Sequence, residues 1–305
     1  MFEVLLIVLP IFIVLATGNI LYRLKFFDQH FMNVSNKLIF YFLLPVLLFY
    51  KIANSNIKSF SLSYLLIIMA STIFIMFFIS FITGNLFGFK KSSIGTFAMN
   101  SFRANYAYMG LPVCYYAFGD KGLTIASILM AFIVPVVNLM SVISLIMTSD
   151  KKMSLKNFIK NTLFNPLAIA CISGIFFSLL SIKIPNFLNK SLELMSNVTL
   201  PLALFSIGAT LDFKKVKGSF KIIFLNVIYK LFLLPLIALV LLKITSPSTT
   251  FSSNILVIML SSPAATVNYI LASEMGGDKD LASSVIILSS AFSILSFVFW
   301  ITILS

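Results

Sequence analysis

The sequence predicts an all-α polytopic membrane protein of ten transmembrane helices, arranged as two inverted five-helix repeats. Two observations predict this fold: long apolar runs recur along the whole chain, and two motifs of the first half return in the second. Hydrophobic residues make up 60% of the 305 residues, mean hydropathy is +1.06, and charged residues are only 10%. These values are typical of a chain that lies mostly in a bilayer.

Apolar runs separated by polar residues, Gly or Pro give the expected spans, because about 20 helical residues cross a hydrocarbon core roughly 30 Å thick. In the first half they are Phe2 to Leu21, Leu38 to Tyr50, Tyr64 to Leu86, Phe97 to Phe118 and Leu123 to Met147. In the second half they are Leu163 to Leu180, Leu192 to Thr210, Ile222 to Leu242, Ser253 to Ala272 and Ala282 to Leu304. The first repeat is therefore expected over residues 1–150 and the second over 162–305, with a lysine-rich cytoplasmic linker at 151–161.

Two motifs indicate the internal repeat. LPVLLF at 44–49 returns as LPLALF at 200–205, and GDKGL at 119–123 returns as GDKDL at 277–281. The two offsets are 156 and 158 residues, nearly the same. Five spans per half is an odd number, so the second copy enters the membrane from the opposite side and the repeats are inverted.

The distribution of basic residues predicts the orientation and limits the partners. The net charge is +13, with 14 Lys and Arg in the loops of one side and 6 in the loops of the other. Cytoplasmic loops hold the excess, which places both termini outside a cell (inner) membrane. The lipid bilayer is therefore an expected partner, and nucleic acid is not.

Enzyme signatures are missing from the sequence. The single histidine, His30, lies in a loop, and no HExxH, GxSxG or phosphate-binding loop is present. Cys114 and Cys171 lie in apolar runs and are interpreted as small buried hydrophobes. We expect no catalytic residues, no bound cofactor and no metal site.

Two prolines mark the expected substrate site. Gly110 and Pro112 lie inside the fourth span, and Ser262 and Pro263 lie inside the ninth. Proline removes a backbone donor, so the sequence predicts two broken helices, 4 and 9, that cross at Pro112 and Pro263. Freed backbone groups and helix ends hold charged solutes in transporters. The alternative is that each proline only kinks its helix.

Polar residues gather around these two breaks and are expected to bind substrate. They are Asn100, Arg103, Asn105, Tyr106, Thr266 and Asn268. The alternative for each Asn or Thr is hydrogen bonding between helices. Two cations lie within spans: Lys230 either attracts an anion or pairs with helix carbonyls, and Arg103 either serves substrate or snorkels to the cytoplasmic interface.

Acidic residues fall near span ends or in loops, which suits an anionic substrate and argues against a carboxylate-based cation pump. Sodium coupling stays open, because backbone carbonyls and Asn or Ser oxygens also hold sodium at unwound helices.

The motifs resemble the auxin efflux carrier family, which includes bacterial malate and malonate permeases. The resemblance runs nearly end to end, and its marks are NYAYMGLP at 105–112, GDKGL at 119–123, Asn165 with Pro166, Pro201 with Gly208 and Ala209, and SPAA at 262–265. It implies an elevator transporter, in which spans 1, 2, 6 and 7 form a scaffold that dimerises and the other spans carry substrate. It also implies that Asn105 lies near a substrate carboxylate, and Asn165 completes the expected site.

The leading hypothesis is a bacterial secondary transporter of a small organic anion such as malate or malonate, uncoupled or coupled to H⁺ or Na⁺. One alternative is sodium-coupled symport of a bulkier anion, as in bile-acid carriers. The other is a membrane receptor or scaffold that does not transport.

Overall fold

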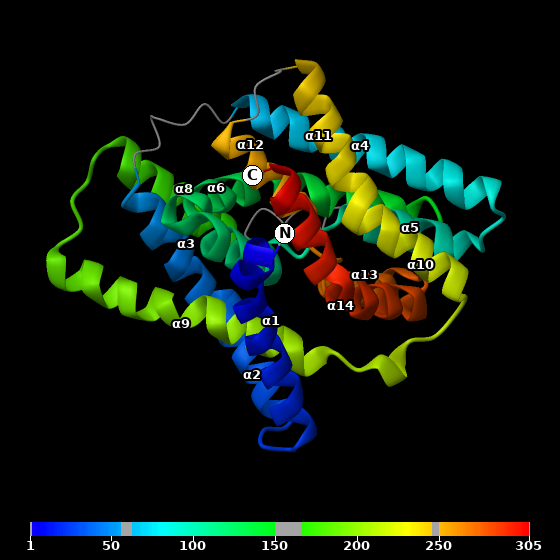
Figure 1. Cartoon of the computed structure of the whole chain (residues 1–305), viewed down its shortest axis with the longest axis horizontal. Coiled ribbons are helices and arrows are strands. Elements are labelled where there is room, and N and C mark those ends of the chain that lie inside the picture. The colour runs from blue at the N-terminus through cyan, green and yellow to red at the C-terminus, as the bar shows by residue number, and fades with distance from the viewer. Residues whose placement is uncertain (1, 56–62, 150–165, 246–249, 305) are drawn as a thin grey trace.

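The computed structural model of the protein describes residues 2–55, 63–149, 166–245 and 250–304 (Figure 1). Regular structure in these residues is helical throughout, and they contain no strand. One isolated antiparallel bridge, between Ala104 and Ala264, is the only β pairing in this part of the chain. The prediction of an all-α protein is therefore confirmed over the described residues.

The first half contains a series of long helices with short interruptions. Their bounds are α1 (Phe2–Arg23), α2 (Gln29–Leu38), the π-helix η1 (Ile39–Leu43), α3 (Leu44–Ala53), α4 (Ser63–Leu86), α5 (Lys91–Phe102), the π-helix η3 (Tyr106–Gly110) and α6 (Leu111–Ile146). Within α6, Gly119 has φ +66°, a conformation that favours glycine, so the helix turns sharply there. A short segment, 111–118, therefore precedes a long one that reaches residue 146.

The second half also consists of helices with short interruptions. Its elements are α8 (Pro166–Leu179), α9 (Asn186–Thr210), the 3₁₀ turn η4 (Phe213–Lys215), α10 (Phe220–Ile228), the π-helix η5 (Tyr229–Leu233), α11 (Leu234–Thr245), α12 (Phe251–Leu260), α13 (Val267–Met275) and α14 (Lys279–Leu304). The predicted linker 151–161 lies outside the described residues.

Seven helical stretches in the described part of the chain are long and apolar enough to cross a membrane. The shorter helices α8 and α12 are apolar as well. Large hydrophobic side chains are exposed along the long helices, as expected where lipid replaces water; examples are Phe78 in α4, Leu194 in α9 and Phe299 in α14. The prediction of a multi-pass membrane protein is confirmed.

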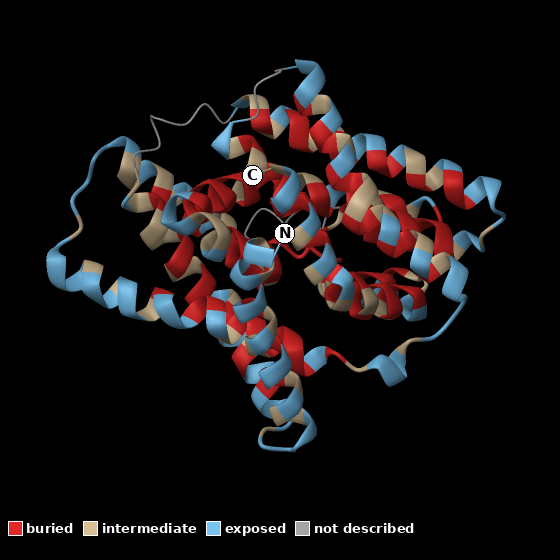
Figure 2. Ribbon diagram, viewed as in Figure 1, coloured by how far each residue is buried: buried red, intermediate tan, exposed pale blue. Residues whose placement is uncertain are grey.

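The helices pack around a central pair, α5 and α6. Every residue of α5 from 93 to 102 is buried, so this helix has protein on all sides (Figure 2). Helix α4 packs on α5, α6 and α11, while α14 packs on α10, α12 and α13. Helix α1 packs on α9, α9 on α3 and α3 on α8, and all four of these helices meet α6.

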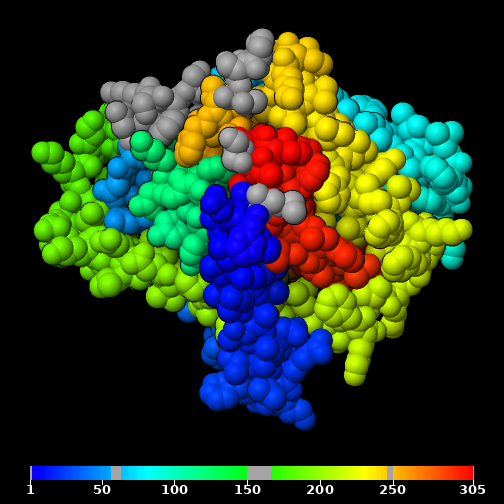
Figure 3. All heavy atoms as spheres, in the orientation of Figure 1, coloured from blue at the N-terminus to red at the C-terminus, as the bar shows by residue number. Residues whose placement is uncertain are grey.

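Helices α1 and α9 approach closely because each has a glycine at the crossing. A Cβ added to Gly208 would lie 1.8 Å from the carbonyl oxygen of Leu15, and one added to Gly18 would lie 2.2 Å from that of Phe205. Small residues allow helix backbones to touch in membranes. Figure 3 shows α1 lying across this face of the molecule, beside α14.

Candidate functional site

The site is built where two helices are interrupted and their interruptions meet. Helix α5 ends at Phe102 and η3 begins at Tyr106, while α12 ends at Leu260 and α13 begins at Val267. The backbone N–H of Asn105 donates to the carbonyl of Pro263 at 2.8 Å, and that of Ala265 donates to the carbonyl of Arg103 at 3.1 Å. The two breaks therefore pair with each other deep inside the protein.

The predicted position of the first break was wrong, whereas Pro263 does lie in the second. The chain leaves α5 at Arg103, which has extended backbone angles (φ −84°, ψ 103°), and Pro112 lies in the first turn of α6. Proline is tolerated in a first turn, where its missing N–H is not needed. The π-helical turn before it, in which the N–H of Leu111 donates to the carbonyl of Tyr106, carries the chain into α6 without a break at the proline.

Asn105 opens the helical segment that follows the first break. Its side-chain oxygen accepts a hydrogen bond from the backbone N–H of Tyr108 at 3.3 Å, an N-cap contact. The N-terminal end of a helix carries a partial positive charge, which attracts anions. This end of η3 and the start of α13 at Thr266 both contribute residues to one cavity.

The cavity has a volume of about 590 Å³, which is in the range of small-molecule sites. It lies between the paired breaks and helices α2, α8 and α9. Its polar and aromatic lining consists of Asn36, Lys37, Phe40, Tyr41, Arg103, Asn105, Tyr106, Tyr108, Asn138, Ser206, Thr210 and Thr266. Four of the predicted site residues thus come together here: Arg103, Asn105, Tyr106 and Thr266.

The cavity is lined by cations, and two of its lining residues carry buried polar groups without a hydrogen-bond partner. Arg103 and Lys37 line it, and none of the described residues that line it is acidic. Arg103 donates from Nη1 to the Ser141 hydroxyl at 3.0 Å, which orients the guanidinium. Among the described residues, the Asn105 Nδ2 and the Tyr106 hydroxyl are buried and have no hydrogen-bond partner. A carboxylate bound beside them would satisfy both groups.

Other predicted site residues support the crossing and do not line the cavity. Asn268 donates from Nδ2 to Asn100 Oδ1 at 2.9 Å, and both side chains are fully buried. Gly110 gives the backbone room, since a Cβ there would lie 2.9 Å from the sulfur of Met259 and 3.1 Å from the Ser262 hydroxyl. For Asn100 and Asn268 the geometry favours the alternative of helix-helix hydrogen bonding.

Lys230 and Asn165 are the remaining predicted site residues. Lys230 is fully buried, and its Nζ donates to the carbonyl of Leu260 at 2.7 Å. It does not line the cavity, so the geometry favours pairing with a helix carbonyl over direct contact with substrate. Asn165 lies outside the described residues.

Sequence reasoning missed the wall of the cavity that lies opposite the breaks. Asn36 and Ser206 meet there, with the Ser206 hydroxyl donating to Asn36 Oδ1 at 2.9 Å. Asn138 reaches the cavity from the middle of α6. One sequence signal could have identified Asn138. A polar amide inside an apolar span is energetically costly, and this argument applies to Asn138 as much as to the predicted site residues.

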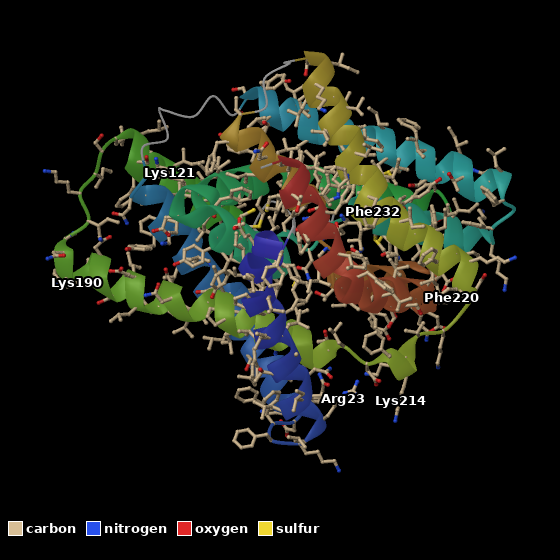
Figure 4. The ribbon with its side chains drawn as sticks, viewed as in Figure 1. Arg23, Lys121, Lys190, Lys214, Phe220 and Phe232 are labelled. Atoms are coloured by element: carbon tan, nitrogen blue, oxygen red, sulfur yellow. The ribbon has the colours of Figure 1, made fainter. Side chains whose placement is uncertain are left out.

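A second cavity, of about 740 Å³, adjoins the first, because Asn36 and Thr210 line both. Its charged lining residues are Arg23, Lys25, Asp28, Asp212, Lys214 and Lys215. Arg23 and Lys214 lie near each other in Figure 4, far from Lys121 and Lys190. Basic residues outnumber acidic ones at this opening, so it favours the approach of anions.

A multi-pass membrane protein whose helix breaks meet beside a cation-lined cavity has the architecture of a membrane transporter. The sequence matches the family described as "Membrane transport protein" over residues 4–301, and the chain belongs to this family, the auxin efflux carrier family. The predicted family is thus confirmed.

Two curated relatives align over nearly their whole length. The chain is 26% identical to "Uncharacterized transporter MJ1031" of Methanocaldococcus jannaschii over 316 residues, covering 98% of this chain and 97% of that protein. It is 22% identical to "Putative malonate transporter" of Rhizobium meliloti over 306 residues, covering 96% and 93% respectively. Both relatives are named as transporters.

Proposed function

We propose that the protein is a secondary transporter of small organic anions, and that its substrate is a dicarboxylate of the size of malonate or malate. The observation that carries the proposal is the cavity at the breaks, which has Arg103 and Lys37 in its lining and no acidic residue among the lining residues that the structure describes. The unpartnered donors of Asn105 and Tyr106 fit carboxylate oxygens. The name of the Rhizobium meliloti relative supports the same class of substrate.

We propose ten crossings in two inverted repeats, 1–150 and 162–305. Contacts between segment ends support this topology, because each joins ends that the sequence assigns to one side. On the proposed outer side, Lys51 pairs with Asp120, Asn54 bonds Asn189, and Asn254 bonds the carbonyl of Leu304. The proposed cytoplasmic ends are joined in the same way, by Ser93 with Asp278 and by Lys217 with Ser284.

The mechanism that we propose is alternating access of the elevator type. Helices α1, α2 with α3, α8 and α9 form the scaffold, and α4 to α6 with α10 to α14 form the carrying domain. The cavity lies between these two sets of helices, which supports a relative movement of one past the other. Since it adjoins the basic opening near Arg23 and Lys214, we assign the structure to a state open to the cytoplasm.

The remaining expectations belong to the same proposal. Both termini lie outside a cell (inner) membrane, no cofactor is bound, coupling is to H⁺, to Na⁺ or to neither, and the scaffold forms a homodimer. Exposed apolar residues of α8 and α9, among them Phe176, Leu188 and Leu194, offer a surface for a second copy or for lipid.

Uptake by reconstituted vesicles tests the function directly. Malonate, malate, acetate and a bile acid are offered in turn, each in sodium and in potassium and at two pH values. Uptake of the two dicarboxylates above acetate supports the proposal. Sodium-dependent uptake of the bile acid alone favours the sodium-coupled alternative.

Binding separates transport from a receptor role. The melting temperature of the purified protein is measured with the same four acids, because a ligand that binds only the folded state raises it. Stabilisation by a dicarboxylate without any uptake favours a non-transporting receptor. No uptake and no stabilisation by any acid overturns the proposed substrate class.

A further inference from the structure

The side chain of Lys230, a residue of η5, contacts the C-terminal end of α12, one of the two interrupted helices. The last carbonyls of a helix have no partner within it, and this end carries a partial negative charge. Leu260 is the last residue of α12, and its carbonyl accepts the 2.7 Å hydrogen bond from the Lys230 ammonium. The side chain of Lys230 is completely buried, so the contact is shielded from water.

Oxygen atoms of three segments gather around this helix end. The π-helix η5 carries both Lys230 and Leu231, and the carbonyl of Leu231 accepts from the Ser296 hydroxyl and from Trp300 Nε1, each at 2.9 Å. The Ser296 hydroxyl also lies 3.3 Å from the carbonyl of Ser261. Carbonyls at unwound helices and helix C-terminal ends are the groups that hold sodium in transporters.

The positive charge of Lys230 is not paired with a carboxylate of any residue that the structure describes. Within the described residues Lys230 takes part in no salt bridge. Its bonded partner is a backbone oxygen, which also binds metal cations. A cation buried in this way is costly inside a membrane protein and usually has a function.

Arg103 gives an internal comparison. It is the C-cap residue of α5, the other helix that ends at the crossing, so each of these helix ends has a cation. Arg103 lines the substrate cavity, whereas Lys230 does not. Arg103 is therefore placed to attract substrate. Lys230 is not, so its buried charge needs another explanation.

We propose that Lys230 is a tethered cation, whose ammonium takes the place of a bound sodium ion at the C-terminal end of α12. The protein therefore needs no sodium to stabilise its crossing, and removing the ammonium creates a sodium site from the oxygens of Leu260, Ser261 and Ser296. This inference goes beyond the proposed function, since it concerns an ion and not the organic substrate.

The test is thermal unfolding of the purified protein in sodium, potassium or N-methylglucamine chloride at equal ionic strength, without any organic acid. The wild type is expected to have one melting temperature in all three salts. Lys230→Ala is expected to melt lower in potassium and to regain about 3 °C or more in sodium, because sodium binds only its folded state. Lys230→Met, which fills the space with an apolar chain, is expected to melt lower in every salt.

Lys243→Ala removes an exposed lysine near the end of α11, the helix that follows η5 directly; it is the matched control and should behave as the wild type. A sodium-dependent melting temperature of the wild type overturns the proposal, as does a folded Lys230→Ala protein that sodium does not stabilise. If Lys230→Ala is recovered in neither salt, Lys230→Gln replaces it, and equal melting in sodium and potassium overturns the proposal. No outcome depends on carboxylate transport, so the two proposals fail separately.

Discussion

The backbone N–H of Asn105 donates to the carbonyl of Pro263 at 2.8 Å, which ties the two interrupted helices together. The return bond from Ala265 to Arg103 and the bond from the N–H of Ala264 to the Ser289 hydroxyl complete the pairing. The breaks thus satisfy several of each other's backbone groups, among residues that are mostly buried. The Nδ2 of Asn105 takes no part in this pairing and has no hydrogen-bond partner among the described residues.

The amide pair beside the two breaks should contribute to stability. Asn268→Ala removes the donor to Asn100 and leaves a buried oxygen unpaired, so we expect the free energy of unfolding to fall by about 1–2 kcal/mol. Asn100→Ala should cost a similar amount, and the double variant less than the sum of the two. Denaturant unfolding in detergent measures all three. Additive losses would contradict the pairing, and Asn85→Ala, at an exposed position, is the control.

Arg103 should distinguish dicarboxylates from monocarboxylates. Arg103→Gln keeps a polar side chain but removes the charge, so we expect at least about tenfold weaker binding of malonate, the effect of about 1.4 kcal/mol. Acetate binding should change less, because the single carboxylate of acetate would still bind to Asn105 and Tyr106. Calorimetric titration measures both ligands. Arg103→Lys, which keeps the charge, should recover part of the malonate affinity, and equal losses for both acids would contradict this role.

The glycines between α1 and α9 should tolerate no larger side chain. Gly208→Val places atoms where the carbonyl of Leu15 lies, so the helices must separate, and we expect a loss of about 2 kcal/mol or more. Gly208→Ala should be milder but in the same direction. The melting temperature in detergent is the measurement. Val198→Ala, on the exposed face of the same helix, should have little effect, and a Gly208→Val protein as stable as the wild type would disprove the close packing.

Local signals in the sequence predicted an all-α membrane protein and part of the site. Apolar runs and prolines are local properties, so the membrane helices and the break at Pro263 could be predicted directly. The shift of the first break from Pro112 to Arg103 could not, because it depends on the π-helical turn before the proline. The far wall of the cavity depends on contacts such as that between Asn36 and Ser206, which are 170 residues apart.

The proposed sidedness makes a labelling prediction for single cysteines. Cys114 and Cys171 are buried, so a membrane-impermeant maleimide should leave the parent protein unlabelled. Lys190→Cys should react in intact cells, and Lys214→Cys only after the membrane is opened, because the proposed orientation puts these two exposed residues on opposite sides of the membrane. The reverse pattern would invert the orientation and place both termini in the cytoplasm.

The same reagent tests whether the cavity opens to the cytoplasm. Thr210 is exposed and lines both cavities, so Thr210→Cys should be labelled from the cytoplasmic side in inverted vesicles. Malonate should slow the reaction several-fold, since a ligand beside Arg103 fills the adjoining space, while the labelling of Lys214→Cys on the exposed loop should be less affected. Protection of both cysteines to the same extent would indicate a general change of conformation. Labelling of Thr210→Cys only from the outer side would contradict the assigned state, because Thr210 lines the same cavity as Arg23 and Lys214, which the proposed orientation puts on the cytoplasmic side.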